Sequence, residues 1–253
     1  MSERDDIARD YEASSRLESA CAALFVLSAS LSVADIVTSS SVWFVSILAA
    51  ISFMSYVIIE VVDDVHFWYK AESERRENAI ETAFDIDLSS AITKGYYNNE
   101  AESGILCYIL NIYESAFFSR SIARAMFPRR ILLCAVVIGL LVAVFALGLS
   151  AYYVTATQAV FSTYFVIGTV NFIVYSCRIG RVDEKFYAAF VTRQFDGESE
   201  QAAPLLANAI EYEAIKAHYK VRLSSKIFER ENLRLSGEWE DLKRRMSEKL
   251  FES

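Results

Sequence analysis

The fold is decided by the stretch ACAALFVLSASLSVADIVTSSSVWFVSILAAISFMSYVII, residues Ala20–Ile59, which contains no lysine, arginine or histidine. A second stretch of the same character, ILLCAVVIGLLVAVFALGLSAYYVTATQAVFSTYFVIGTVNFIVY, covers Ile131–Tyr175. A helix needs about 20 mostly apolar residues to cross a bilayer, at about 1.5 Å rise per residue. Each stretch is therefore long enough to cross a membrane twice. The sequence predicts an all-α, polytopic membrane protein with four transmembrane helices in two hairpins.

The predicted spans cover residues 20–37, 42–59, 131–153 and 158–175. The chain then divides into a cytosolic lead-in (1–19), hairpin 1 (20–59), a cytosolic helical region (60–130), hairpin 2 (131–175) and a cytosolic helical C-terminal region (176–253). A soluble all-helical protein with two buried hairpins is the alternative, since core helices of a large protein are also apolar. The distribution of basic residues argues against that alternative.

Basic residues flank the same ends of all four predicted spans, and both hairpin turns have none. These flanking residues are Arg16, Lys70, Arg75, Arg76, Arg129, Arg130, Arg178 and Arg181. Cytoplasmic loops of membrane proteins carry an excess of lysine and arginine. We therefore expect both termini and the 60–130 region to lie in the cytoplasm.

The polar regions favour helices, because eight glycines and two prolines in 253 residues are too few for a turn-rich β fold. The second span is expected to continue as one helix toward Glu81. Apolar residues recur at helical spacing between Ala101 and Met126, and Pro128 then interrupts the pattern. The remaining predictions are a helix over 183–194, a loop over 195–201, a helix from Pro204 through Arg230, a break near Ser236–Gly237 and a last helix over Glu238–Phe251.

The segment KGYYNNE, Lys94–Glu100, brings a cation, two aromatic rings and two amides into one turn. Such groups stack on a nucleobase, contact its edge and hold a phosphate. The candidate ligand-binding residues here are Lys94, Tyr96, Tyr97, Asn98 and Asn99. The same residues also suit a structural turn in which Asn98 or Asn99 caps the following helix.

Two basic sets are candidates for binding a polyanion. Arg120 and Arg124 are four residues apart, which places them on one face of a helix. Lys220, Arg222 and Lys226 lie in the C-terminal region. A groove between the two sets would bind phosphates in a salt-dependent way. The net charge of −8 disfavours general coating of nucleic acid, and ordinary solvated helix faces remain the alternative.

Polar residues inside the predicted spans are candidates for lining a pore, because burying them in lipid is costly. Asp35 lies near the outer edge of its span, whereas Thr169 and Asn171 lie deeper. Hydrogen bonds between two helices are the alternative role for the deeper pair.

Enzymatic and metal-binding signatures are missing from the sequence. Asp63, Asp64 and His66 form no ligand set with His218, and we expect an acidic collar at the membrane edge instead of a metal site. No nucleophile elbow, P-loop or HExxH pattern occurs. We therefore expect a protein that is not an enzyme and needs no cofactor.

Three segments resemble a known family. FDIDLSSAITKGYYNNE (Phe84–Glu100), followed by AFFSR (Ala116–Arg120), is similar to the four-span membrane effectors of nucleotidyltransferase-linked bacterial anti-phage systems. SSKIFERENLRLSGEWEDLKRRMSE is similar to the C-terminal helices of that family, with Ile227, Phe228, Arg230 and Trp239 at the matching positions. The resemblance implies that a partner nucleotidyltransferase makes a nucleotide or short oligonucleotide, and that the effector oligomerises and breaches the bacterial inner membrane.

The combined hypothesis is a homo-oligomeric effector, with a tetramer as the working assumption, that lies in the lipid bilayer and binds a nucleotide-type signal through its cytosolic helices. The signal can either open or close the assembly, since either sign needs only a difference in affinity between two states. The alternative is a non-conducting membrane anchor that docks a cytosolic protein partner. A small transporter is a third class, disfavoured because no span is interrupted by proline and no charge pair lies at mid-depth.

Overall fold

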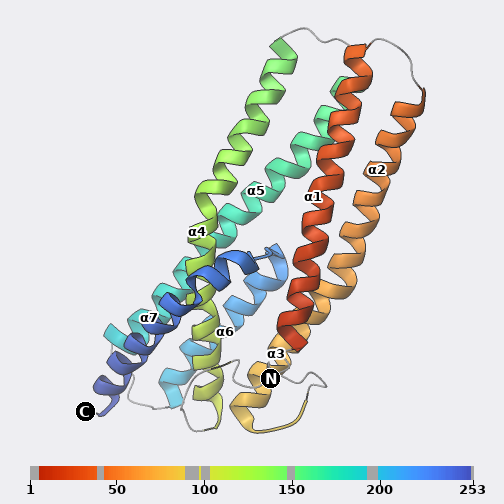
Figure 1. Ribbon diagram of the computed structural model, residues 1–253. Coiled ribbons are helices and arrows are strands. Elements are labelled where there is room, and N and C mark those ends of the chain that lie inside the picture. Colours follow the sequence, from red (N-terminus) through yellow and green to blue (C-terminus); the bar gives the residue numbers. More distant parts are fainter. Residues whose placement is uncertain are drawn as a thin grey trace. The chain divides into compact units, whose positions relative to one another are not determined.

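A computed structural model of the chain describes residues 6–38, 43–88, 97, 103–146, 152–192 and 199–251. Within these ranges the chain is helical and contains no β-strand, which confirms the all-α class. The helices are α1 (Asp6–Thr38), α2 (Trp43–Val62), η1 (Asp63–Trp68), α3 (Tyr69–Phe84), α4 (Ile105–Ala146), α5 (Tyr152–Tyr187), η2 (Ala188–Thr192), α6 (Ser199–Tyr219) and α7 (Ser225–Phe251) (Figure 1).

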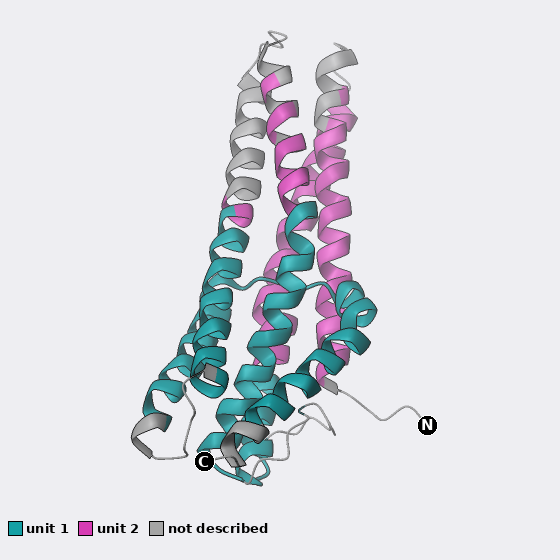
Figure 2. Ribbon diagram, turned by 90° about the vertical axis from the view of Figure 1, so that its left-hand side faces the viewer, with its two compact units in different colours: residues 1–5, 74–129, 170–253 teal, residues 6–73, 130–169 magenta. Residues whose placement is uncertain are grey.

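The chain divides into two compact units (Figure 2). Unit 1 contains residues 74–129 and 170–253 along with the first five residues, and unit 2 contains residues 6–73 and 130–169. Helices α3, α4 and α5 each contribute residues to both units. Unit 2 therefore holds most of the apolar sequence, and unit 1 holds most of the charged sequence.

In unit 2, α1 and α2 pack against each other in antiparallel fashion. Ser28 donates its hydroxyl to the carbonyl oxygen of Ala49 at 3.1 Å, and the rings of Phe25 and Tyr56 lie 5.5 Å apart. At the charged end of the pair, the ammonium of Lys70 lies 2.7 Å from a carboxylate oxygen of Asp10.

A π-helical segment, η1, joins α2 to α3, and the three together form one uninterrupted helix. The helix predicted to run from the second span toward Glu81 is thus confirmed and reaches Phe84. A π-turn uses one more residue than an α-turn. At the end of η1 and the start of α3, the ring of Tyr11 on α1 lies 5.9 Å from that of Trp68, and its hydroxyl donates to Glu72 at 2.8 Å.

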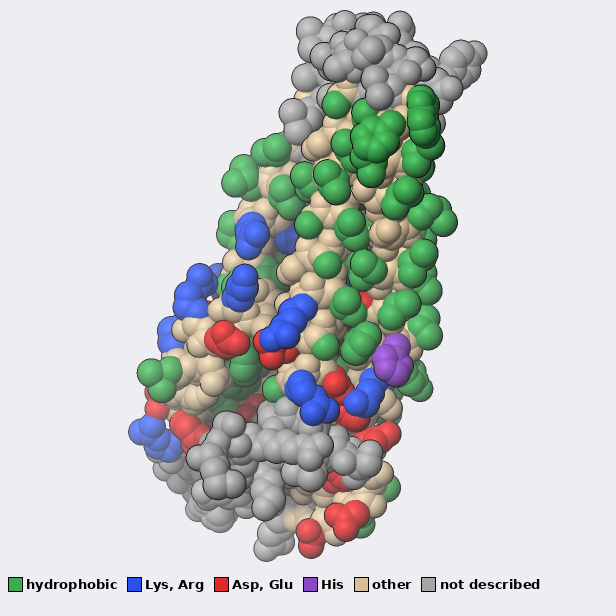
Figure 3. Space-filling model, turned by 45° about the vertical axis from the view of Figure 1, so that its right-hand side comes forward, with side chains coloured by type: hydrophobic (Ala, Val, Ile, Leu, Met, Phe, Trp, Pro, Cys, Tyr) green, Lys and Arg blue, Asp and Glu red, His purple; other side chains and the backbone are tan. Residues whose placement is uncertain are grey.

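One helix among the described residues, Trp43–Phe84, is long and apolar enough to cross a membrane. Large apolar side chains are exposed along it, including Trp43 (73%), Ile51 (56%) and Ile58 (57%). Figure 3 shows hydrophobic side chains following the α1–α2 pair. The other three predicted spans run into residues whose side chains lie outside the described part of the chain, so the four-span arrangement stays a prediction.

The core of unit 1 forms where α4, α5 and α7 meet around aromatic rings. Tyr113 on α4 lies 5.0 Å from the ring of Phe186 and 5.2 Å from that of Trp239. Helix α7 buries Leu235, Trp239, Leu242 and Met246, whose four-, three- and four-residue spacing forms one helical stripe. This stripe is the face by which α7 packs into the core of unit 1.

Several predicted boundaries were wrong. Helix α4 continues through Pro128, and Pro204 is the sixth residue of α6 instead of its first turn. The break in the C-terminal region lies at residues 220–224, and α7 runs through Ser236 and Gly237 without interruption. Tyr152 and Tyr153, predicted to end the third span, belong to α5.

Candidate functional site

The connection between α6 and α7 packs against α4 in unit 1. Lys220 ends α6 with a left-handed backbone (φ 48°), and its N–H donates to the carbonyl of Lys216 at 3.2 Å. The backbone N–H of Ser224 then donates to the sulfur of Met126 at 3.4 Å. The side-chain oxygen of Ser224 also accepts from the N–H of Ile227 at 3.4 Å, which caps the first turn of α7.

Basic residues lie close to this contact in the sequence of each element. Arg124 lies two residues before Met126, and Arg222 and Lys226 lie two residues on either side of Ser224. The guanidinium of Arg178 on α5 lies 5.5 Å from the ring centre of Tyr219, the residue before Lys220. We call this region the basic surface, defined by Arg124, Arg178, Lys220, Arg222 and Lys226. All are exposed except Arg222, which is half-buried.

Arg120 is engaged elsewhere. Its guanidinium forms an ion pair with Asp183 on α5, and its Nη2 atom lies 3.4 Å from a carboxylate oxygen of Glu184. The predicted pairing of Arg120 with Arg124 on one helix face holds by spacing, since both belong to α4. The Arg120 side chain, however, points toward Asp183 and lines a pocket.

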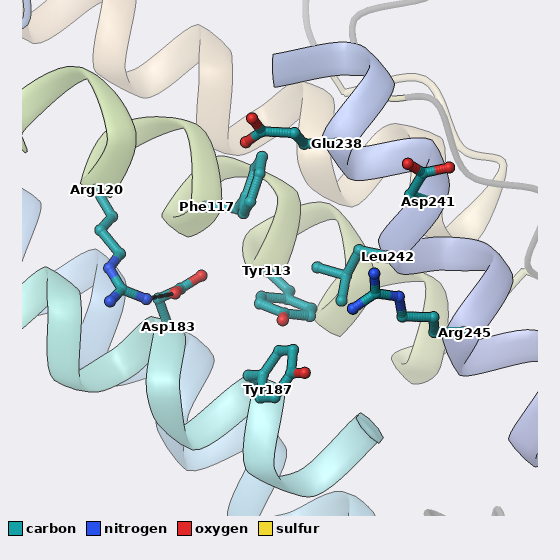
Figure 4. A pocket seen from close by; sticks show the side chains of 9 residues that line it. All are labelled: Tyr113, Phe117, Arg120, Asp183, Tyr187, Glu238, Asp241, Leu242 and Arg245. Atoms are coloured by element: carbon teal, nitrogen blue, oxygen red, sulfur yellow. Dashed lines mark hydrogen bonds and ion pairs between the residues drawn. The ribbon is translucent and has the colours of Figure 1, made fainter. Parts of the chain in front are cut away.

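The pocket lies between α4, α5 and α7 and has a volume of about 340 Å³. Figure 4 shows Arg120 and Asp183 meeting on one side of it, the rings of Tyr113 and Tyr187 facing each other, and α7 on the other side. Its lining residues combine aromatic rings with charges of both signs: Tyr113, Phe117, Arg120, Asp183, Tyr187, Glu238, Asp241, Leu242 and Arg245. Such a mixture suits a small planar ligand with polar edges.

Asp183 is the most buried charged group of the pocket, with 6% of its side chain exposed. Burial raises the pKa of its carboxyl, and the hydrogen bond and charge of Arg120 lower it by a smaller amount. Only Oδ2 pairs with Arg120; Oδ1 has no hydrogen-bond partner among the described residues. A buried acceptor left without a donor costs about 1–3 kcal/mol, so this oxygen favours a bound donor.

Tyr97 is the described member of the Lys94–Glu100 segment, and it is buried in unit 1. Burial raises its pKa to about 12, an effect partly offset by the nearby Arg75 and by a hydrogen bond with Ser115. Its position favours a structural role over direct contact with a ligand. Lys94, Tyr96, Asn98 and Asn99 lie outside the described residues.

The predicted intramembrane candidates fall on α1 and α5. Asp35 belongs to α1, but its side chain lies outside the described part of the structure. Thr169 is buried on α5 and Asn171 is half-buried on the same helix. On η1, Asp63 is buried and His66 is exposed, and no group of three potential metal ligands comes together among the described residues.

Sequence reasoning missed most of the pocket. Tyr113, Asp183, Tyr187 and Arg245 come from three helices, and no local motif joins them. It also treated Arg75 only as a marker of topology, whereas the buried Arg75 guanidinium forms an ion pair with Glu213 on α6. Arg120 is the lining residue that the sequence did nominate, as one of the candidate basic residues. No protein family, curated protein or solved structure matches this chain.

Proposed function

We propose that this chain is a multi-pass effector of the bacterial inner membrane, with both termini in the cytoplasm, that senses a nucleotide or oligonucleotide signal and forms an oligomeric pore in anti-phage defence. In this proposal the apolar hairpins lie in the bilayer, and the helices of unit 1 bind the signal. The partner that supplies the ligand is a nucleotidyltransferase.

The membrane part of the proposal is supported by the apolar surface of α2. Exposed side chains such as Phe44, Ile47 and Met54 continue the row of Ile51 and Ile58. Burial of apolar surface away from water gains about 25 cal/mol per Å². A surface of this composition is therefore stabilised by lipid, and it is destabilised by contact with water. Orientation follows from the basic residues that flank the apolar stretches on one side.

The single observation that carries the ligand-binding part is the contact between Ser224 and Met126. It holds the start of α7, which carries Lys226, against α4, which carries Arg124. Each phosphate neutralised on a single-stranded ligand contributes a slope of roughly −0.7 to the dependence of log affinity on log salt concentration. Binding to the basic surface is therefore expected to weaken steeply as salt rises.

A pore requires more than one copy, because four spans enclose too little space for an aqueous conduit. Asp35, Thr169 and Asn171 are the polar side chains that we propose line it. Ligand binding biases the assembly between conducting and closed states through a difference in affinity, and either direction is compatible with the proposal.

The second candidate function is a non-conducting anchor that docks a cytosolic protein. Exposed apolar side chains in unit 1 favour it: Leu233 on α7 is 89% exposed, and Ile210 on α6 is 60% exposed. Docking on α7 leaves the bilayer sealed, so ion flux separates this candidate from the effector.

The test uses purified full-length protein in liposomes loaded with a potassium-sensitive dye. We expect ion flux that changes when a short oligoadenylate is added, and oligoadenylate binding that weakens with salt. The double variant Arg124→Glu, Lys226→Glu should lose both responses while still inserting into membranes. Arg234→Glu serves as the matched control, because Arg234 is an exposed arginine of α7 two turns beyond Lys226.

The proposal fails if the oligonucleotide neither binds nor alters flux in the unmodified protein, or if the double variant responds like the control. Absence of flux in every condition, together with binding of a cytosolic protein to α7, favours the anchor.

A further inference from the structure

The pocket of unit 1 contains a buried hydrogen-bond acceptor that the fold does not satisfy. Asp183 Oδ1 has no partner among the described residues, while Oδ2 of the same carboxylate is held by Arg120. The Asp183 side chain is more than nine-tenths buried and lines the pocket. In Figure 4 this carboxylate lies between Arg120 and the ring of Tyr113, at one edge of the labelled residues. A ligand that fills the pocket therefore meets an acceptor that needs an N–H or O–H donor.

The size of the pocket limits what it can hold. Small-molecule sites span about 300–1,000 Å³, and 340 Å³ lies at the lower end of that range. One nucleotide fits such a volume, but a folded oligonucleotide does not. An oligonucleotide must then place one nucleotide in the pocket and its other nucleotides outside it.

The walls of the pocket suit the flat faces of a nucleobase. Phe117 from α4 and Tyr187 from α5 are the more accessible rings of its lining, whereas Tyr113 is 1% exposed and already packs on Phe190 and Trp239. Each base stacked on an aromatic side chain gains binding energy whatever its sequence, because every base has a π-face. The stacking surfaces therefore select for a planar ring, and the polar groups decide which ring.

We propose that the pocket binds a nucleobase that carries an exocyclic amino group, and that Asp183 Oδ1 accepts a hydrogen bond from that group. A carboxylate accepts well from base amino groups, as in contacts to N4 of cytosine. A base with a carbonyl oxygen at the same position places that oxygen against Asp183 Oδ1. Both atoms are hydrogen-bond acceptors, so we expect such a base to bind more weakly. This inference rests on the proposed function. It specifies which nucleobases of the ligand the pocket recognises.

The path out of the pocket is consistent with a nucleotide. Arg120 lines the pocket, and Arg124 of the basic surface follows it by one turn of α4, about 5–6 Å along the same face. We therefore expect the phosphates attached to the bound base to lie toward Arg124. On the opposite wall, Glu238 and Asp241 repel phosphate, and Arg245 is the one arginine of that wall.

The test compares three mononucleotides by isothermal titration calorimetry on the full-length protein in detergent. Adenosine 5′-monophosphate carries the amino group, purine riboside 5′-monophosphate lacks it, and inosine 5′-monophosphate has a carbonyl in its place. We expect the adenosine compound to bind about tenfold more tightly than either of the others. This comparison uses the unmodified protein, so it does not depend on the folding of a variant.

Two substitutions then assign the preference to Asp183. Asp183→Asn supplies an amide donor, so it should shift the preference toward the inosine compound. Asp183→Glu keeps a carboxylate and should retain the preference for the adenosine compound. A shift in the order of ligands is not expected from a residue that merely holds helices together.

Equal affinity of the unmodified protein for the adenosine and purine riboside compounds overturns the inference. Tighter binding of tetramethylammonium than of any nucleotide also overturns it and marks the pocket as a site for organic cations. If oligoadenylate still binds the basic surface while no mononucleotide enters the pocket, the inference alone fails. If oligoadenylate does not bind either, the proposed function fails with it.

Discussion

Arg75 and Glu213 form an ion pair in unit 1, in which one guanidinium nitrogen contacts both carboxylate oxygens. The Nη2 atom of Arg75 lies 2.7 Å from one carboxylate oxygen of Glu213 and 3.0 Å from the other, and the Arg75 side chain is 3% exposed. Arg76 adds a contact of 2.8 Å from its Nε atom, and the guanidinium of Arg75 lies 5.6 Å from the ring centre of Tyr212. The pair joins α3, the extension of the apolar hairpin helix, to α6.

Removing Arg75 leaves the half-buried carboxylate of Glu213 with Arg76, the more exposed of its two arginine partners. Breaking a buried ion pair costs about 3–5 kcal/mol, and we expect Arg75→Ala to lie near the lower limit because Arg76 remains. Arg76→Ala is the matched control, since its side chain is 34% exposed and the expected loss is under about 1 kcal/mol. Denaturant unfolding in detergent, followed by circular dichroism, measures both losses. Equal losses would show that burial of Arg75 is unimportant.

Stability is expected to fall at alkaline pH through Tyr97. Its pKa is about 12 in the folded chain against an ordinary 10.0, with burial as the main cause. The folded state therefore keeps the proton longer than the unfolded state. The stabilisation is fully present below pH 10, declines as pH rises toward 12, and amounts to roughly 2–3 kcal/mol.

Tyr97→Phe should remove that part of the pH dependence, measured as the free energy of unfolding at a series of alkaline pH values. Tyr69→Phe controls for the loss of a tyrosine, because Tyr69 is 66% exposed on α3. The prediction is wrong if the Tyr97 and Tyr69 variants show the same alkaline profile.

Trp239 holds α7 against the rings of α4. It lies 5.2 Å from Tyr113 and 5.7 Å from Phe117, and only 1% of it is exposed. Truncation of a buried tryptophan to alanine costs about 3–5 kcal/mol through lost burial and the resulting cavity. Trp239→Ala should therefore destabilise unit 1 by this amount, seen as a lower denaturant midpoint.

Leu233→Ala is the control for Trp239→Ala, because Leu233 belongs to the same helix and is 89% exposed. Its substitution should change stability by no more than about 0.5 kcal/mol. If Trp239→Ala and Leu233→Ala unfold at the same denaturant midpoint, Trp239 does not hold α7 against α4.

A charge in the middle of α2 should impair membrane insertion. Ile51 lies near the centre of the apolar sequence of α2 and is 56% exposed. A lysine at the centre of a spanning helix costs about 2.5–3.5 kcal/mol. Ile51→Lys is expected to lower the fraction of protein that floats with liposomes in a density gradient.

Val65→Lys provides the comparison, since Val65 is 69% exposed on η1 between Asp64 and His66, where the sequence turns polar. This variant should float like the unmodified protein. Normal flotation of Ile51→Lys would argue that α2 does not enter the hydrocarbon region.

The helical class and the long continuation of α2 into α3 were predictable, because apolar composition and the scarcity of glycine act over many residues at once. The boundaries were less predictable. Pro128 lacks an N–H and usually ends or kinks a helix. Here α4 continues through it, and the division between the two units follows one residue later, after Arg129.

The break between α6 and α7 shows why local signals failed. Gly237 costs about 1 kcal/mol relative to alanine inside a helix, which suggested a stop. The buried side chains of Leu235 and Trp239 on either side of it outweigh that cost. The actual stop uses a left-handed backbone at Lys220, a residue type that gives no sequence signal for it.

The periodicity of apolar residues and the asymmetry of basic ones settled the helical class and the expected orientation, because both depend on average composition along the chain. The pocket and the basic surface were settled only when the chain folded. Arg120 meets Asp183, and Met126 meets Ser224, across separations of 63 and 98 residues. Such pairings depend on how three helices pack their buried faces, and no property of a single helix encodes them.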